Sequence, residues 1–157
     1  LEKLYKKGCV CMGWIYAAIA GAAMSFQGVF NTRLSEKIGL LESNAFVQGT
    51  AFLLSLAAVF IFGKGNFSLI GQSDKLYLSG GAIGLVITVT VMLSMSALSP
   101  TAAVSSILVA QLLAAAAIDY FGLFGSEKTP FGWEKFAGVA LMIVGILLFK
   151  GVFFKSK

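Results

Sequence analysis

The chain has 157 residues, of which 58% are hydrophobic and only 12% are charged, and its mean hydropathy is +0.89. A soluble domain carries about a quarter charged residues, and so short a soluble chain could not bury this much apolar surface. The composition therefore excludes an ordinary soluble domain and predicts a protein that crosses a membrane several times.

The net charge of +5 does not indicate nucleic-acid binding. The lysines lie at the ends of apolar segments and form no stripe interleaved with aromatic residues, so we interpret them as topology signals and membrane anchors. The two cysteines, Cys9 and Cys11, have no second Cys pair and no histidine to complete a zinc site. We expect no metal and no cofactor.

Residues 1–11 (LEKLYKKGCVC) are basic and precede Met12, which is a plausible start residue. We interpret them as a short cytoplasmic tail or as an extension from an upstream start codon. A cleaved signal peptide fits poorly, because the apolar region that follows is too long and has no small-residue cleavage site.

Five apolar segments follow, each close to the roughly 20 residues that cross a ~30 Å hydrocarbon layer. They predict helices at residues 13–34, 44–62, 78–98, 101–121 and 133–149. The fold class is therefore all-α, with one five-helix transmembrane domain at residues 12–150 and a basic tail at 151–157.

Several local signals set the helix ends. Ser43 or Asn44 is expected to cap the second helix, which closes at Gly63. Ser99 and Pro100 form the shortest connection, which predicts that the third and fourth helices are antiparallel neighbours with Pro100 at a helix start.

Glycines spaced along the helices predict close helix contacts. Gly80 and Gly84 form a small-xxx-small pair in the third helix, and Gly138 and Gly145 lie seven residues apart in the fifth.

Five helices place the two chain ends on opposite sides of the membrane, here called side A at the amino terminus and side B. Seven Lys and Arg residues fall on side A and five on side B, or four against five if Met12 is the start. This bias is too small to fix one orientation. It leaves a weakly N-inside protein or a dual-topology protein whose copies insert both ways.

Uncharged amides stand out inside the apolar segments. Gln27 and Asn31 are four residues apart and share a helix face, Gln48 follows in the second helix, and Gln111 lies near the middle of the fourth. An unpaired amide in hydrocarbon costs several kcal/mol, so each must face a partner, water or a ligand. Two interpretations remain open, interhelical hydrogen bonding and the wall of a polar transport path.

Hydroxyl groups on the third helix add to this set. Thr88 is central and Ser94 leans towards side B, so they could converge with the glutamines in the half of the membrane that faces side B. The simpler interpretation for these hydroxyls is a hydrogen bond to a carbonyl of their own helix.

Apart from Glu134 at the very start of the fifth segment, Asp119 is the one acid inside a predicted helix span, about one turn from side A. It is either a gate or proton-sensitive group or a solvated interfacial acid. Arg33 belongs to the end at side B and can extend its charge to the interface. The two cannot pair within one subunit, but they could pair in an antiparallel dimer.

Nothing in the sequence forms a catalytic set. It contains no histidine, no paired acids in the membrane segments and no phosphate-binding glycine loop beside a Lys-Ser/Thr pair. We therefore predict no enzymatic activity and no catalytic residue.

Three motifs together resemble a known family. They are S-F-Q-G-V-F-N-T-R-L at residues 25–34, G-L-L-E-S-N-A-F-V-Q-G-T at 39–50 and V-A-Q-L-L-A-A-A-A-I-D-Y-F-G-L-F-G at 109–125. In order and spacing they are similar to the YdcZ-like branch of the drug/metabolite transporter superfamily, over residues 12–150.

The resemblance implies a multi-pass protein of the bacterial inner membrane, corresponding to half of an EamA-like ten-helix inverted-repeat transporter. A single half would need a partner copy, most simply an inverted one, or a paralogue. The family's polar positions match Gln27, Asn31, Gln48, Gln111 and Asp119. The first helix lacks the central glutamate through which the small multidrug-resistance relatives couple to protons.

These observations lead to one main hypothesis and one alternative. The main hypothesis is a secondary transporter, an exporter of a small metabolite or drug-like solute that acts as a dimer by alternating access. The alternative is an accessory membrane protein that packs beside a larger complex. A dimeric ion channel fits less well, because no ring of charges or carbonyl filter is visible. The sequence names neither the solute nor the coupling ion.

Overall fold

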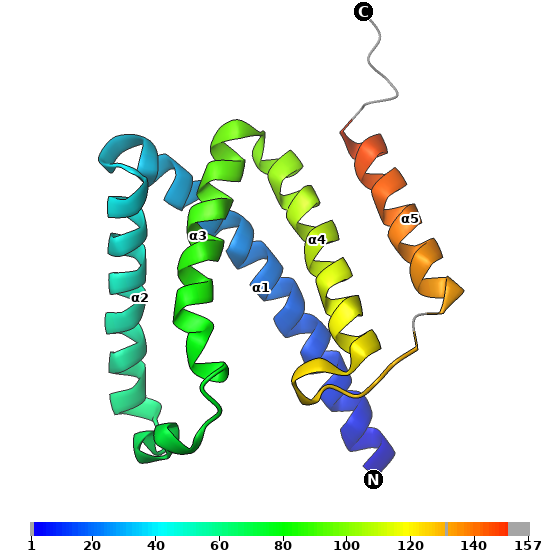
Figure 1. The fold of residues 1–157 in the computed structure, drawn as a ribbon, viewed down its shortest axis with the longest axis horizontal. Helices are drawn as coiled ribbons and strands as arrows, with labels where there is room; N and C mark the ends of the chain where they lie inside the picture. The colour runs from blue at the N-terminus through cyan, green and yellow to red at the C-terminus, as the bar shows by residue number, and fades with distance from the viewer. Residues whose placement is uncertain (1, 131, 151–157) are drawn as a thin grey trace, which may run out of the picture. The chain divides into compact units, whose positions relative to one another are not determined.

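The computed structural model describes residues 2–130 and 132–150, and in these ranges it consists of helices and turns without a strand. The long helices are α1 (Glu2–Ile38), α2 (Leu40–Phe62), α3 (Gly80–Ala97), α4 (Pro100–Phe121) and α5 (Trp133–Phe149), and the short 3-10 helices are η1 (Phe67–Gln72), η2 (Tyr77–Ser79) and η3 (Leu123–Gly125) (Figure 1). The predicted all-α fold is confirmed.

Length and composition identify most of these helices as membrane spans. Four candidate spans are found in the described part of the chain, at Cys11–Ile38, Leu40–Phe62, Tyr77–Ala97 and Pro100–Phe121. The fifth helix, α5, has 17 residues, which is the lower end of the range that crosses a bilayer. Few side chains in these spans are buried, so most of their apolar surface is available to lipid or to another protein copy.

The chain divides into two compact units, Leu1–Leu98 and Ser99–Lys157. In the first unit α1 packs against both α2 and α3, and α2 packs against α3. In the second unit α4 packs against α5. The predicted turn at Ser99 and Pro100 is thus the boundary between the units.

A single residue separates α1 from α2. Gly39 has φ 101° and ψ 157°, a backbone conformation that is essentially restricted to glycine. The prediction that Ser43 or Asn44 caps the second helix is wrong, because α2 begins at Leu40 and its N-cap, Gly39, provides no side chain. Ser43 and Asn44 lie inside the helix instead, and both are buried.

The other helix ends follow the sequence signals more closely. Ser99 caps α4 by accepting a hydrogen bond from the Ala102 N–H at 3.4 Å, and Pro100 occupies the first turn as predicted. Gly122 ends α4 in the left-handed conformation, with φ 63°. The bounds of α5 are those predicted, whereas α1 is continuous from Glu2 and extends to Ile38.

A close contact between α1 and α3 lies at Gly28. A Cβ atom placed on Gly28 would lie 2.6 Å from Met95 Cε and 3.3 Å from Val91 Cγ1. Met95 is only 6% exposed, so glycine is needed here for the two helices to approach. The glycines that the sequence singles out are less closely packed than Gly28. A Cβ atom placed on Gly84 would have one neighbour within 4 Å, and a Cβ atom on Gly80, Gly138 or Gly145 would have none in the described part of the chain.

Candidate functional site

Gln48 is a half-buried polar side chain of α2 that lies beside α3. Because α2 begins at Leu40, Gln48 is about 12 Å along the helix axis from that end, which is further than a start at residue 44 predicts. The side chain is half-buried, and its Nε2 lies 3.7 Å from the position of a Cβ on Gly84 of α3. The amide therefore lies beside α3 at a glycine, where that helix has no side chain.

Thr88 lies one turn further along α3 and is also half-buried. Its Oγ1 donates a hydrogen bond of 2.8 Å to the carbonyl oxygen of Gly84, the residue that Gln48 contacts. The simpler of the two predictions for this hydroxyl is thus confirmed. The bond uses the hydroxyl proton only, so Thr88 Oγ1 keeps lone pairs that can accept a hydrogen bond from a bound molecule. We call Gln48, Gly84 and Thr88 the Gln48 site.

A second polar group, the corner cluster, lies where α1 turns into α2. It comprises Asn31, Thr32, Ser43 and Asn44, whose exposed fractions range from 0% to 7%. Ser43 Oγ donates to the Asn31 carbonyl oxygen at 3.2 Å and so ties the two helices together. Thr32 Oγ1 donates to the Gly28 carbonyl oxygen at 2.8 Å.

Asn44 differs from the rest of the corner cluster. Its Oδ1 is buried and has no hydrogen-bond partner among the residues that the structure describes. A buried acceptor without a donor costs about 1–3 kcal/mol. Asn44 Oδ1 is thus an unsatisfied acceptor inside the corner cluster.

The remaining amides and Ser94 are placed differently. Gln27 on α1 and Gln111 on α4 are exposed, whereas Ser94 on α3 is half-buried. Thr88 and Gln48 are brought together, but Gln111 belongs to the second unit, and its convergence with Gln27 and Gln48 stays a prediction.

In the second unit Asp119 lines a groove between α4 and α5. The groove has a volume of about 250 Å³, and the residues that line it are Leu112, Ala115, Ala116, Asp119, Lys135, Gly138 and Val139. Asp119 and Lys135 are both half-buried, so a carboxylate and an ammonium group share one small apolar groove. Asp119 thus shares its groove with a lysine of α5, and its predicted role as a gate or proton-sensitive group stays a prediction.

Arg33 has a partner close by in the sequence. Its Nη1 lies 3.0 Å from Glu36 Oε2, one turn further along α1, and the two side chains are 74% and 48% exposed. An exposed pair of this kind is weak. The predicted pairing of Arg33 with Asp119 across an antiparallel dimer stays a prediction.

Sequence reasoning missed two residues of these sites, Asn44 and Lys135. Asn44 was assigned to a helix cap, and the signal against this was Gly39, whose freedom of backbone conformation permits an earlier helix start. Lys135 was counted as a topology charge. The connection of residues 122–132 returns the chain so that the first turn of α5 lies beside the last turn of α4.

Comparison with known proteins agrees with this architecture. The family model described as "Putative inner membrane exporter, YdcZ" matches residues 12–148. No curated protein and no solved structure matches the chain. The family is one of membrane exporters and not of enzymes, and its members belong to the inner membrane. With its apolar helices, the chain is a multi-pass inner membrane protein that belongs to the YdcZ family of the drug/metabolite transporters.

Proposed function

We propose that this protein exports a small, hydrogen-bonding metabolite or drug-like solute, as a dimer that works by alternating access. The observation that carries the proposal is the Gln48 site, where the amide of Gln48 on α2 and the hydroxyl of Thr88 on α3 both lie beside Gly84. Such groups are expensive to keep in a membrane and are typical of substrate pathways. Asn44, with its unpaired Oδ1, supplies an acceptor at the end of the same helix.

The character of these groups favours an uncharged part of the solute as the recognised element. Gln48, Thr88 and Asn44 are all neutral, and each offers a lone pair to an N–H or O–H donor. A hydroxyl- or amide-bearing solute matches these groups better than a solute recognised through its net charge.

The exposed amides support the dimer. Gln27 and Gln111 lie in the interior of apolar spans and are exposed in the single chain, where lipid would leave their polar atoms unpaired. A second copy would cover these faces, and a water-filled path between the two copies would solvate both amides. In this proposal they line the path, Asn31 lies at its mouth on side B, and Asp119 and Arg33 act as gate groups.

The test is solute efflux from proteoliposomes, screened over metabolite classes. Gln48→Leu keeps size and apolar fit but removes the amide, and we expect about a tenfold lower rate at low solute concentration, the equivalent of one hydrogen bond. Gln27→Leu and Gln111→Leu should act in the same direction. Thr90→Val is the matched control, because Thr90 is exposed and bonds back to Val86 of its own helix.

A flux that is unaffected by Gln48→Leu would remove the Gln48 site from the path. If no solute class moves with the wild-type protein, the accessory role becomes the better description. Reporter fusions at the carboxyl end would settle orientation, and signal from both sides of the membrane would establish dual topology.

A further inference from the structure

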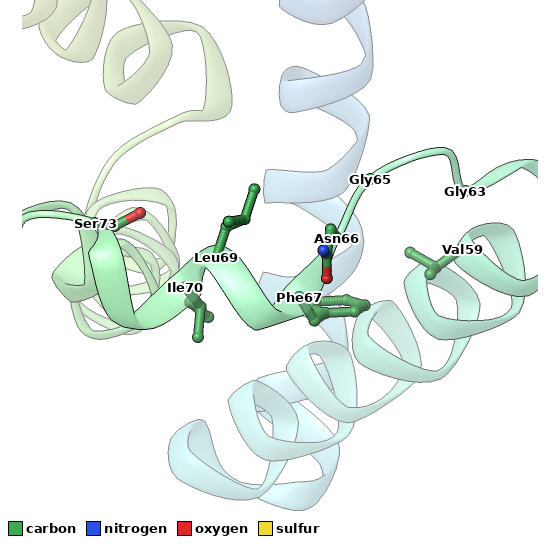
Figure 2. A pocket seen from close by; sticks show the side chains of 8 residues that line it. All are labelled: Val59, Gly63, Gly65, Asn66, Phe67, Leu69, Ile70 and Ser73. Atoms are coloured by element: carbon green, nitrogen blue, oxygen red, sulfur yellow. The ribbon is translucent and has the colours of Figure 1, made fainter.

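A pocket lies where α2 ends and the chain turns into η1, on side A. Its volume is about 380 Å³, within the range of sites that hold small ligands. The residues that line it are Val59, Gly63, Gly65, Asn66, Phe67, Leu69, Ile70 and Ser73. Figure 2 shows Val59 on α2 and, on η1, Leu69 and Ile70 on opposite sides of the ribbon. The pocket is separate from the Gln48 site and from the corner cluster.

The turn that shapes this pocket is specified by the sequence. A Cβ atom on Gly63 would collide with the carbonyl oxygen of Val59, so the sharp exit from α2 requires glycine. After it, Asn66 Oδ1 accepts a hydrogen bond of 2.9 Å from the Ser68 N–H and caps η1. The apolar wall of η1 is thus held in place by local bonds.

The apolar side chains of η1 remain largely uncovered by the protein. Phe67, Leu69 and Ile70 are 69%, 52% and 56% exposed. Since α2 is a membrane span that ends at Phe62, this wall lies at the depth where hydrocarbon gives way to lipid headgroups. Lipid acyl chains are the apolar material present at that depth.

The charge around the pocket indicates which lipid fits best. Lys64 stands between Gly63 and Gly65, both of which line the pocket, and no acid is among the lining residues. Lys75 follows the far end of η1. Asp74 is the nearest acid in the sequence, and its Oδ1 accepts a hydrogen bond from the Leu76 N–H at 3.1 Å. A lysine beside an apolar pocket at the membrane interface attracts an anionic headgroup.

We propose that the η1 pocket binds a phospholipid with an anionic headgroup. One acyl chain lies against Val59, Phe67 and Ile70, and the headgroup phosphate lies near Lys64. The site does not depend on the transported solute. It fixes the connection between α2 and α3 to the lipid of one leaflet.

The experiment uses tryptophan fluorescence in vesicles. Phe67→Trp is made in a Trp14→Phe, Trp133→Phe background, and vesicles of phosphatidylcholine contain a small fraction of brominated phosphatidylglycerol or of brominated phosphatidylcholine. We expect the brominated phosphatidylglycerol to quench the tryptophan as if this lipid were about fivefold enriched at the pocket over the bulk bilayer. A fivefold enrichment is the effect of one lysine at a membrane surface. Lys64→Gln should reduce this enrichment to that of phosphatidylcholine.

A second measurement tests whether a protein side chain that fills the pocket excludes the lipid. A Cβ on Gly65 meets nothing within 4 Å, so Gly65→Leu can place its side chain in the pocket, and it should reduce quenching by both lipids. Gly71→Leu is the matched control, because Gly71 is equally open but does not line the pocket. Equal quenching by the two brominated lipids, or none by either, would overturn the proposal. So would unchanged quenching in Gly65→Leu.

Discussion

The contact between Gly28 and Met95 gives the sharpest test of how the first unit is packed. In Gly28→Leu the new side chain begins 2.6 Å from Met95 Cε and 2.9 Å from Met95 Sδ. The tip of Met95 is flexible, but Met95 and the neighbouring Met92 are only 6% and 1% exposed, so the tip has to repack against neighbouring side chains inside the unit. Overpacking a well-filled site costs about 1–3 kcal/mol. We expect Gly28→Leu to lower the free energy of unfolding by about 2–3 kcal/mol.

The assay is unfolding of the protein in detergent micelles, monitored by the circular-dichroism signal of its helices. Gly21→Leu is the matched control, since Gly21 lies on the same helix and a Cβ there meets nothing within 4 Å. Adding Met95→Ala to Gly28→Leu should recover about 1–2 kcal/mol relative to the sum of the single changes, because the two residues are in contact. If Gly28→Leu and Gly21→Leu are equally stable, or if the double variant is additive, α1 and α3 do not approach as described.

Three further predictions concern the turn between α1 and α2. Asn44→Leu removes the unpaired Oδ1, so we expect it to raise the free energy of unfolding by about 1–2 kcal/mol and at the same time to lower solute efflux, a combination that a purely structural residue would not give. Gly39→Ala should lower stability by about 1–3 kcal/mol, because alanine is strained at φ 101°, and the same unfolding titration measures it. Glu36→Gln breaks the exposed pair with Arg33 and should change stability by less than about 1 kcal/mol, and a larger loss would mean that Arg33 is held more tightly than its exposure indicates.

The sequence predicts the helices well because hydrophobic runs and their breakers act locally. The bounds of α5 are those predicted, and Pro100 and Gly122 mark the two ends of α4 as their backbone preferences require. The error at the start of α2 arose because two signals competed. Ser43 and Asn44 favour a cap, but a glycine four residues earlier permits the turn and lets both side chains enter the helix.

The site is harder to predict because it depends on which faces meet. Glycine spacing singles out Gly80, Gly84, Gly138 and Gly145 equally, yet the tight contact forms at Gly28. Spacing along one helix says nothing about the side chains on the opposite helix, and Met95 decides this contact. In the same way, Gln48 is recognisable as an unusual amide, but its position against α3 depends on the register between two helices.

The length of α1 has a consequence for the choice of bilayer. Its candidate span, Cys11–Ile38, has 28 residues, but Arg33, Glu36 and Lys37 near its end are charged, so the uncharged part, residues 11–32, is about 33 Å long and slightly exceeds a typical hydrocarbon layer. A helix tilt of ordinary size absorbs a mismatch of a few Å. In a thin membrane the turn at Gly39 and the polar residues packed beside it lie closer to the headgroups, and in a thick membrane they lie in hydrocarbon. The length of the lipid acyl chains therefore changes how easily water reaches Asn44.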